Sequence, residues 1–148
     1  MEDGMAVVER AVSLFQEGFN CSQSVCTAFS EGLGYSQEQS LKVSSAFGGG
    51  IGHNDEMCGA VSGALMVVGM KYGRVKADDT EAKLKCYNLA GEFIRQFKEI
   101  YGSVQCTDLL GCDLSTEDGM QSAREKGLFS TICVNLVRDA ARILEGLL

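Results

Sequence analysis

Residues 47–66 read FGGGIGHNDEMCGAVSGALM, a glycine-rich segment that passes through a polar turn into an apolar run. Four glycines within residues 48–52 leave the backbone almost free of Cβ restrictions, which permits unusual φ values or a very close approach. Asn54 and Asp55 are natural N-caps for a following helix, and either places Cys58 in its first turn. Backbone N–H groups and the positive end of the helix dipole favour a thiolate there. We therefore interpret Cys58 as the leading candidate for chemistry and expect its pKa to lie below the usual value of about 8.5.

Outward from this segment, the hydrophobic spacing and the capping residues predict helices throughout the chain. No stretch shows the sustained alternation of a β-strand, so we assign no sheet. The sequence predicts one all-α domain over residues 1–148, a bundle of about six to seven helices with the small-residue helix at its centre. The expected helices span residues 3–17, a second capped by Asn20 and closed by Gly32 to Gly34, a third from Ser36 to Phe47, and the central one at 56–72. They continue with a long helix from Asp78 and Asp79 to Gly102, one from Ser115 to Gly127 and the last at 132–148, with a short turn at 106–110.

Composition narrows the classes of protein that need to be considered. The chain has 148 residues and a net charge of −7, without a Lys/Arg cluster that could neutralise phosphates. Nucleic acid and anionic membrane surfaces are therefore not expected partners. No apolar run reaches the roughly 18 residues of a membrane span, and the acidic N-terminus lacks the pattern of a signal peptide. The expected compartment is the cytoplasm.

Seven cysteines are many for a chain of this length. Their number is odd, the expected compartment is reducing, and a core of this size needs no disulfides for stability. No CxxC pair is present, which removes the simplest thioredoxin-like and zinc-ribbon interpretations. Cys86 lies on the apolar stripe of the long helix and is interpreted as a core residue.

The segment 58–63, CGAVSG, resembles the bacterial and archaeal family of redox-active proteins named after the cysteine pattern C_GCAxxG_C_C. The resemblance runs from end to end, through residues 18–23, 47–52, 69–73 and 106–111. It implies a domain of about this length whose four hallmark cysteines are Cys21, Cys58, Cys106 and Cys133. It also implies that Cys26, Cys86 and Cys112 are packing residues. Genes of the family often lie near transporter genes, which implies a partner linked to transport.

Two hypotheses of different classes follow for the hallmark cysteines. In the first, the chain is a thiol oxidoreductase or redox sensor: Cys58 attacks a disulfide or an oxidant, and another cysteine, from Cys21, Cys106 and Cys133, resolves the intermediate. In the second, the four cysteines bind zinc or an iron–sulfur cluster as one Cys₄ site. Redox chemistry ranks first, with no cofactor expected, because the sequence lacks short-spaced ligand pairs. A purely structural accessory protein linked to a transporter is the third alternative.

Three further features of the sequence bear on possible function. His53 could act as a base or a metal ligand, but a single histidine in a polar turn is more often a solvated side chain. The glycine run lacks both the Gly-Lys-Ser/Thr of a phosphate loop and a preceding strand, which argues against nucleotide binding. Gly59, Gly63 and Gly69 would suit either a close helix contact or a surface for self-association, so a homodimer is compatible with the sequence. The identity of a redox partner protein does not follow from the residues.

Overall fold

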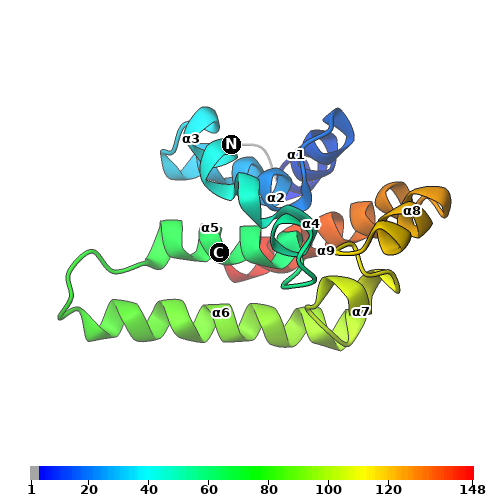
Figure 1. Ribbon diagram of the computed structural model, residues 1–148. Helices are drawn as coiled ribbons and strands as arrows, with labels where there is room; N and C mark the ends of the chain where they lie inside the picture. Colours follow the sequence, from blue (N-terminus) through cyan, green and yellow to red (C-terminus); the bar gives the residue numbers. More distant parts are fainter. Residues whose placement is uncertain (1–3) are drawn as a thin grey trace.

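A computed structural model describes residues 4–148 of the chain, and it shows an all-helical protein (Figure 1). The predicted fold class is confirmed: across this described range, the β-type pairing is confined to an isolated bridge between Met57 and Gln105. Residue 3, the first of the predicted helix 3–17, lies outside the described residues. The helices are α1 (Gly4–Glu17), α2 (Cys21–Ser30), η1 (Glu31–Leu33), α3 (Gln37–Ser44), η2 (Ser45–Phe47), α4 (Gly48–His53), α5 (Gly59–Tyr72), α6 (Thr80–Tyr101), α7 (Cys106–Leu110), α8 (Glu117–Glu125), η3 (Phe129–Cys133) and α9 (Val134–Leu147).

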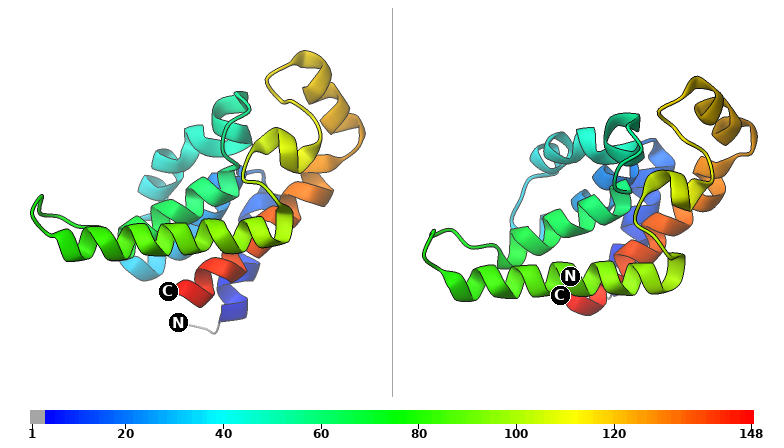
Figure 2. Two further views of the ribbon diagram at one scale, coloured as in Figure 1. Left: turned by 90° about the horizontal axis from the view of Figure 1, so that it is seen from below. Right: turned by 60° about the horizontal axis from the view of Figure 1, so that its bottom comes forward.

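Helix α5 lies at the centre of the fold, as the sequence predicts. It packs against α2 on one side and against α6 and α9 on others, while α1 packs against α2 and α9. The views in Figures 1 and 2 show α5 and α6 side by side, with α9 crossing them. Val61, Ala64 and Val67 of α5 and Phe93 and Phe97 of α6 have no exposed surface, and the two helices pack against each other. Among residues 4–148, no helix is both long and apolar enough to cross a membrane.

Most helix ends form at the capping residues that the sequence indicates. Asn20 makes a capping box, because its side chain accepts from the Gln23 N–H while the Gln23 side chain accepts from the Asn20 N–H. Asp79 and Thr116 accept from backbone N–H groups at the starts of α6 and α8. Gly102 ends α6 in the left-handed conformation, with φ of 80°.

The start of α5 differs from the prediction. The helix begins at Gly59, and its N-cap is Cys58 itself, not Asn54 or Asp55. The Asp55 carboxylate instead accepts a hydrogen bond of 3.1 Å from the Thr107 N–H, so it caps α7, 52 residues further along the chain. The prediction was wrong because a carboxylate can satisfy any helix start that the fold brings near it, and sequence proximity does not reveal the distant one.

The glycine run forms a turn of left-handed helix. Residues 49–53 all have φ between 60° and 72°, including the non-glycine residues Ile51 and His53. The Gly50 carbonyl accepts from the N–H groups of Asn54 at 3.2 Å and Glu56 at 3.0 Å, which closes the turn. Left-handed helical conformation costs about 1–2 kcal/mol for each residue with a Cβ, so Ile51 and His53 are strained. The glycines supply the remaining positions without this cost.

The C-terminal helix starts earlier than the predicted residue 132. Gly127, with φ of 67°, ends α8, and the chain then passes through a π-helical turn at Phe129–Cys133 that runs directly into α9. Cys133 is therefore the last residue of a wide turn inside a longer helix, not the first residue of a new one. Such π turns are rare and occur often at functional sites.

The apolar stripe of α6 is buried along only part of its length. Ile100 lies three residues after Phe97, at helical spacing, but 55% of its surface is exposed, whereas Phe93 and Phe97 are fully buried. Cys86, interpreted as a core residue, is only half-buried and packs against the edge of the core. The stripe is therefore fully buried at Phe93 and Phe97 and partly or largely exposed at Cys86 and Ile100.

Two glycines let α5 touch the backbone of α2. A methyl group on Gly63 would lie 2.6 Å from the Ser22 carbonyl oxygen, and one on Gly59 would lie 3.0 Å from the Ser22 nitrogen. The close helix contact that the small residues allow is therefore used inside the chain. The predicted surface for self-association at Gly59 and Gly63 is covered by α2, whereas Gly69 has nothing within 4 Å of a methyl group.

Candidate functional site

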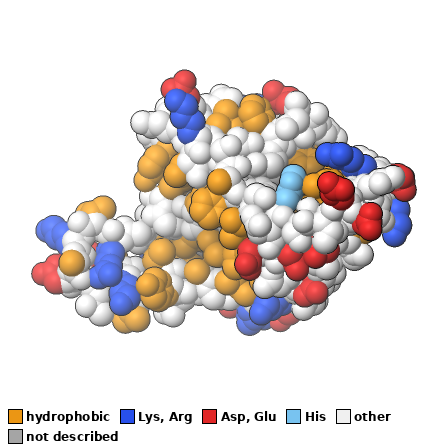
Figure 3. All heavy atoms as spheres, viewed as in Figure 1, with side chains coloured by type: hydrophobic (Ala, Val, Ile, Leu, Met, Phe, Trp, Pro, Cys, Tyr) orange, Lys and Arg blue, Asp and Glu red, His pale blue; other side chains and the backbone are white. Residues whose placement is uncertain are grey.

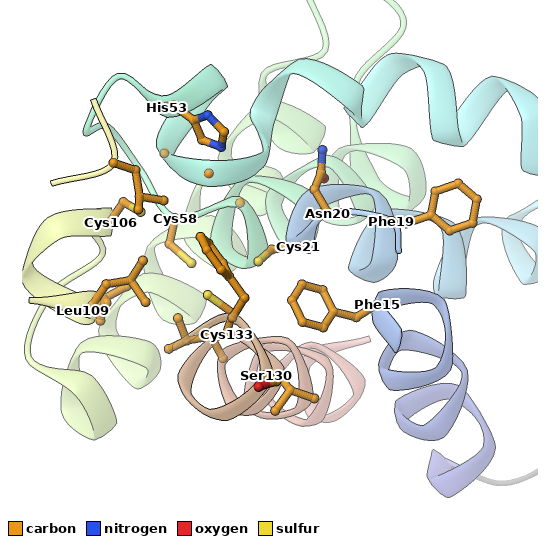
Figure 4. A pocket seen from close by; sticks show the side chains of 18 of the residues that line it. Phe15, Phe19, Asn20, Cys21, His53, Cys58, Cys106, Leu109, Ser130 and Cys133 are labelled. Carbon is orange, nitrogen blue, oxygen red and sulfur yellow. The ribbon is translucent and has the colours of Figure 1, made fainter. Parts of the chain in front are cut away.

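The four hallmark cysteines line one cavity of about 500 Å³ (Figure 4). All four are free thiols, and none is more than 8% exposed. Figure 4 shows Cys21, Cys58 and Cys133 turned toward one another across the cavity, with Cys106 beside Cys58. The structure thus brings together residues that lie up to 112 positions apart, from Cys21 to Cys133.

Each of these cysteines belongs to a different helix or helix start. Cys21 is the first residue of α2, Cys58 is the N-cap of α5, and Cys106 is the first residue of α7. Cys133 ends the π turn before α9. The contact of Ser22 with Gly59 explains the approach of the first two, because each of these residues directly follows a hallmark cysteine.

A short antiparallel ribbon holds Cys58 and Cys106 on the same side. The Cys58 N–H donates to the Val104 carbonyl at 2.7 Å, and the Cys106 N–H donates to the Glu56 carbonyl at 3.0 Å, on either side of the Met57–Gln105 bridge. In this register Cys58 and Cys106 are diagonal neighbours, for which the spacing is about 7–8 Å. That spacing exceeds the Cα separation of about 4.4–6.8 Å found in disulfides. The ribbon therefore keeps the two thiols near each other without favouring a bond between them.

Cys21 and Cys133 form a hydrogen-bonded pair of sulfurs. The bond from the Cys21 thiol lowers the pKa of Cys133, against the opposing effect of burial. The same bond, together with burial, raises the pKa of Cys21 well above its ordinary value. The bond therefore makes Cys21 the donor and favours the thiolate form at Cys133. Of the four cavity thiols, Cys133 is the one whose pKa is lowered.

The predicted pKa of Cys58 was wrong in direction. Burial raises it from 9.0 to about 11, although the N–H groups of Ala60 and Val61 at the start of α5 do act on the sulfur and lower it. The first-turn argument identified these donors correctly. Desolvation outweighs them because only 4% of Cys58 is exposed. Cys58 is therefore a neutral thiol near pH 7.

Cys106 is also neutral, for similar reasons. Burial is the main cause that raises its pKa to about 12, and the charges of neighbouring groups, Asp55 and Asp113 among them, add to the effect. Asp55 is held in place by the Thr107 N–H, so its charge stays close to this thiol. Like Cys58, Cys106 therefore has a pKa well above neutral pH.

The walls of the cavity are mainly apolar. Phe15, Phe19 and Phe129 contribute aromatic rings, and leucines contribute much of the rest. None of the described residues that line it is Asp, Glu, Lys or Arg. The polar side chains are those of Gln16, Asn20, Ser130 and His53.

His53 lies at the cavity on the left-handed turn. A methyl group on Gly49 would lie 2.3 Å from its Cδ2 atom, so the ring rests directly on the glycine backbone. The expectation of a solvated side chain agrees with its exposure, but the residue also lines the cavity, as Figure 4 shows. Sequence reasoning did not foresee this placement, since it depends on the left-handed turn.

The other three cysteines do not line the cavity. Cys26 is fully buried, and its pKa is raised to about 11 by burial despite a hydrogen bond with Ser44. Cys112 donates to the Ser122 hydroxyl at 3.5 Å. With Cys86 at the edge of the core, these residues occupy packing positions.

In the part of the chain that the structure describes, no three side chains of His, Cys, Asp or Glu are arranged to hold a metal ion.

Several lining residues were missed by the sequence analysis. Phe15, Phe129 and Ser130 adjoin no recognised motif, and they enter the cavity only because α1 and the π turn meet there. Phe19, Asn20 and Leu109 lie in the segments 18–23 and 106–111 of the family resemblance, and their positions near Cys21 and Cys106 were the available signal.

Fold and cavity together define an all-helical protein with four cysteines gathered at one apolar site. Residues 19–147 match the family model described as "Putative redox-active protein (C_GCAxxG_C_C)". The chain belongs to this family, as the resemblance in its sequence indicated, and the family description assigns it a redox role. Comparison with curated proteins and with solved structures found no match.

Proposed function

We propose that the chain carries out thiol–disulfide exchange, with Cys133 as the nucleophile and Cys21 as the resolving thiol. The observation that carries the proposal is the hydrogen bond from the Cys21 thiol to Cys133 inside the cavity. A thiolate is the reactive species in this chemistry, and the pair supplies one together with a neighbouring thiol. Cys58, the leading candidate from the sequence, is a neutral thiol near pH 7 and is assigned no step in this exchange.

The reaction proceeds in two displacements. The Cys133 thiolate attacks one sulfur of a disulfide R–S–S–R′, which breaks the S–S bond, releases R′–S⁻ and leaves Cys133 joined to R through a mixed disulfide. Cys21 loses its proton to the departing thiolate and attacks the Cys133 sulfur. This forms the Cys21–Cys133 disulfide and releases R–S⁻, which takes a proton from water. Two thiols of the protein are oxidised by two electrons, and one external disulfide is reduced to two thiols.

The test uses reduced protein, a small disulfide, rapid alkylation and peptide mapping by mass spectrometry. Wild type should yield the Cys21–Cys133 disulfide. Cys21→Ser keeps a hydroxyl donor but cannot resolve, so the mixed disulfide should accumulate on Cys133. In Cys21→Ala the donor is absent, the pKa of Cys133 rises, and alkylation of Cys133 at pH 7 should slow.

Cys26→Ser is the matched control, because this thiol is buried outside the cavity. It should form the Cys21–Cys133 disulfide as wild type does. Modification of Cys58 before Cys133, or a disulfide that joins Cys58 to Cys106 while Cys21 remains free, would contradict the proposed roles.

A further inference from the structure

The cavity differs from the rest of the molecule in its electrostatics. The chain has 20 acidic and 13 basic residues, yet neither kind lines the cavity. Lys and Arg side chains lie instead on the outer surface, for example over the connection between α5 and α6 at the left of Figure 3 and beside the single histidine on the right. Arg74, Lys76 and Lys85 are exposed at that connection and the start of α6, at the opposite end of α5 from the helix starts that carry the thiols.

This arrangement offers no counter-ion to a charged group that enters with a disulfide. Moving a carboxylate from water into an apolar space without a partner is costly. The Cys133 thiolate, already in the cavity, adds repulsion to an anion, and the net charge of −7 disfavours its approach. The Cys133 thiolate attracts a cation at first, but its charge is lost when its sulfur attacks the disulfide, and no carboxylate on the wall replaces it. A small neutral disulfide loses little on entry and gains apolar contact with Phe15, Phe19 and Phe129.

Size sets a second limit. A volume of about 500 Å³ lies within the range of sites for small molecules, roughly 300–1,000 Å³. Because Cys133 is only 5% exposed, a disulfide on the flat surface of a folded protein cannot reach it without distortion.

We propose that the substrate class of this cavity is a small uncharged disulfide with short arms, and that a wall without Asp, Glu, Lys or Arg side chains excludes its charged counterparts. The inference rests on the proposed function, since it assigns a substrate class to the Cys21–Cys133 pair. It concerns selection by charge and not the identity of the nucleophile.

Three short disulfides that differ in their end groups provide the test: bis(2-hydroxyethyl) disulfide, which is neutral, 3,3′-dithiodipropionate, which is a dianion, and cystamine, which is a dication. Formation of the Cys21–Cys133 disulfide is followed by alkylation and mass spectrometry. Each rate is divided by the rate of dithiothreitol with the same disulfide, which removes differences in intrinsic reactivity. The neutral disulfide should react at least about tenfold faster than either charged one on this scale, a difference of about 1.4 kcal/mol.

A pair of charge variants tests the cause. Gln16 is exposed and lines the cavity, so Gln16→Lys should speed the dianion about two- to fivefold. Gln39→Lys adds the same charge at an exposed position of α3 outside the cavity and should change none of the normalised rates. Equal normalised rates, or a faster reaction of a charged disulfide, would overturn the inference while leaving the Cys21–Cys133 exchange intact. Failure of all three to oxidise the pair would overturn the proposed function as well.

Discussion

Replacing Gly50 by alanine should destabilise the protein much more than the same change at Gly52. Both residues lie in the left-handed turn, with φ of 72° and 62°, so alanine costs about 1–2 kcal/mol at either position from backbone strain. At Gly52 the nearest atom to a methyl group is 3.7 Å away, an ordinary contact. At Gly50 the methyl group would lie 2.8 Å from the Cys106 Cβ and 3.1 Å from the Glu56 nitrogen.

The crowding at Gly50 adds an overpacking cost of about 1–3 kcal/mol. Neither neighbour can turn aside, because the Glu56 N–H donates to the Gly50 carbonyl and the Cys106 N–H donates to the Glu56 carbonyl. The total for Gly50→Ala is therefore about 2–5 kcal/mol, against about 1–2 kcal/mol for Gly52→Ala.

Urea unfolding of the reduced proteins, followed by circular dichroism, measures both free energies. The rate of alkylation of Cys106 in the native state is a second readout, since only Gly50→Ala should displace this thiol. Equal losses of stability in the two variants, with unchanged alkylation of Cys106, would refute the account of the turn as a close support for the cavity wall.

Three further predictions concern packing and ionisation. Gly63→Ala should cost about 1–3 kcal/mol, because its methyl group meets the Ser22 carbonyl at 2.6 Å, whereas Gly69→Ala should stabilise by about 0.5–1 kcal/mol in open space; similar unfolding midpoints would contradict this. Three buried thiols have pKa values raised from 9.0 to about 11 or 12, so the folded chain retains more protons than the unfolded chain in this window. The free energy of unfolding should fall as pH rises from about 9 to 12, by up to about 1.4 kcal/mol per pH unit for each thiol, and Cys26→Ala should reduce the slope in pH-dependent urea unfolding. Cys86→Ala should cost less than about 1 kcal/mol without altering oxidation of the cavity thiols, because Cys86 is half-buried at the edge of the core; a loss of oxidation in mass spectrometry would show that it was misassigned.

The sequence carries enough local information to predict the helices. Caps such as Asn20 and stop residues such as Gly102 act through hydrogen bonds and φ preferences within a few residues, and both were identified correctly. The central position of α5 also followed from its composition, since a helix apolar on all sides must be covered on all sides.

Features that depend on contacts between distant parts of the chain could not be predicted from the sequence. Asp55 caps α7, and this choice is settled by the ribbon between Met57 and Gln105. The balance of pKa effects at Cys58 likewise depends on how deeply neighbouring helices bury it. The four cysteines were known as a set from the family resemblance, but their pairing required the position of Cys133 relative to Cys21.

The π turn at Phe129–Cys133 sets the rotational phase of the C-terminal helix. Successive residues of an α-helix are about 100° apart, so one extra residue in a turn rotates everything before it by that angle relative to everything after it. Phe129 and Ser130 can thereby face the cavity while Val137 and Ala140 face the core. Val134 and Leu136, which follow the turn, also line the cavity, so residues on both sides of the turn reach the same site. The inserted residue thus sets which face of the segment before Cys133 meets the cavity, and Cys133 lies where the rotational phase changes.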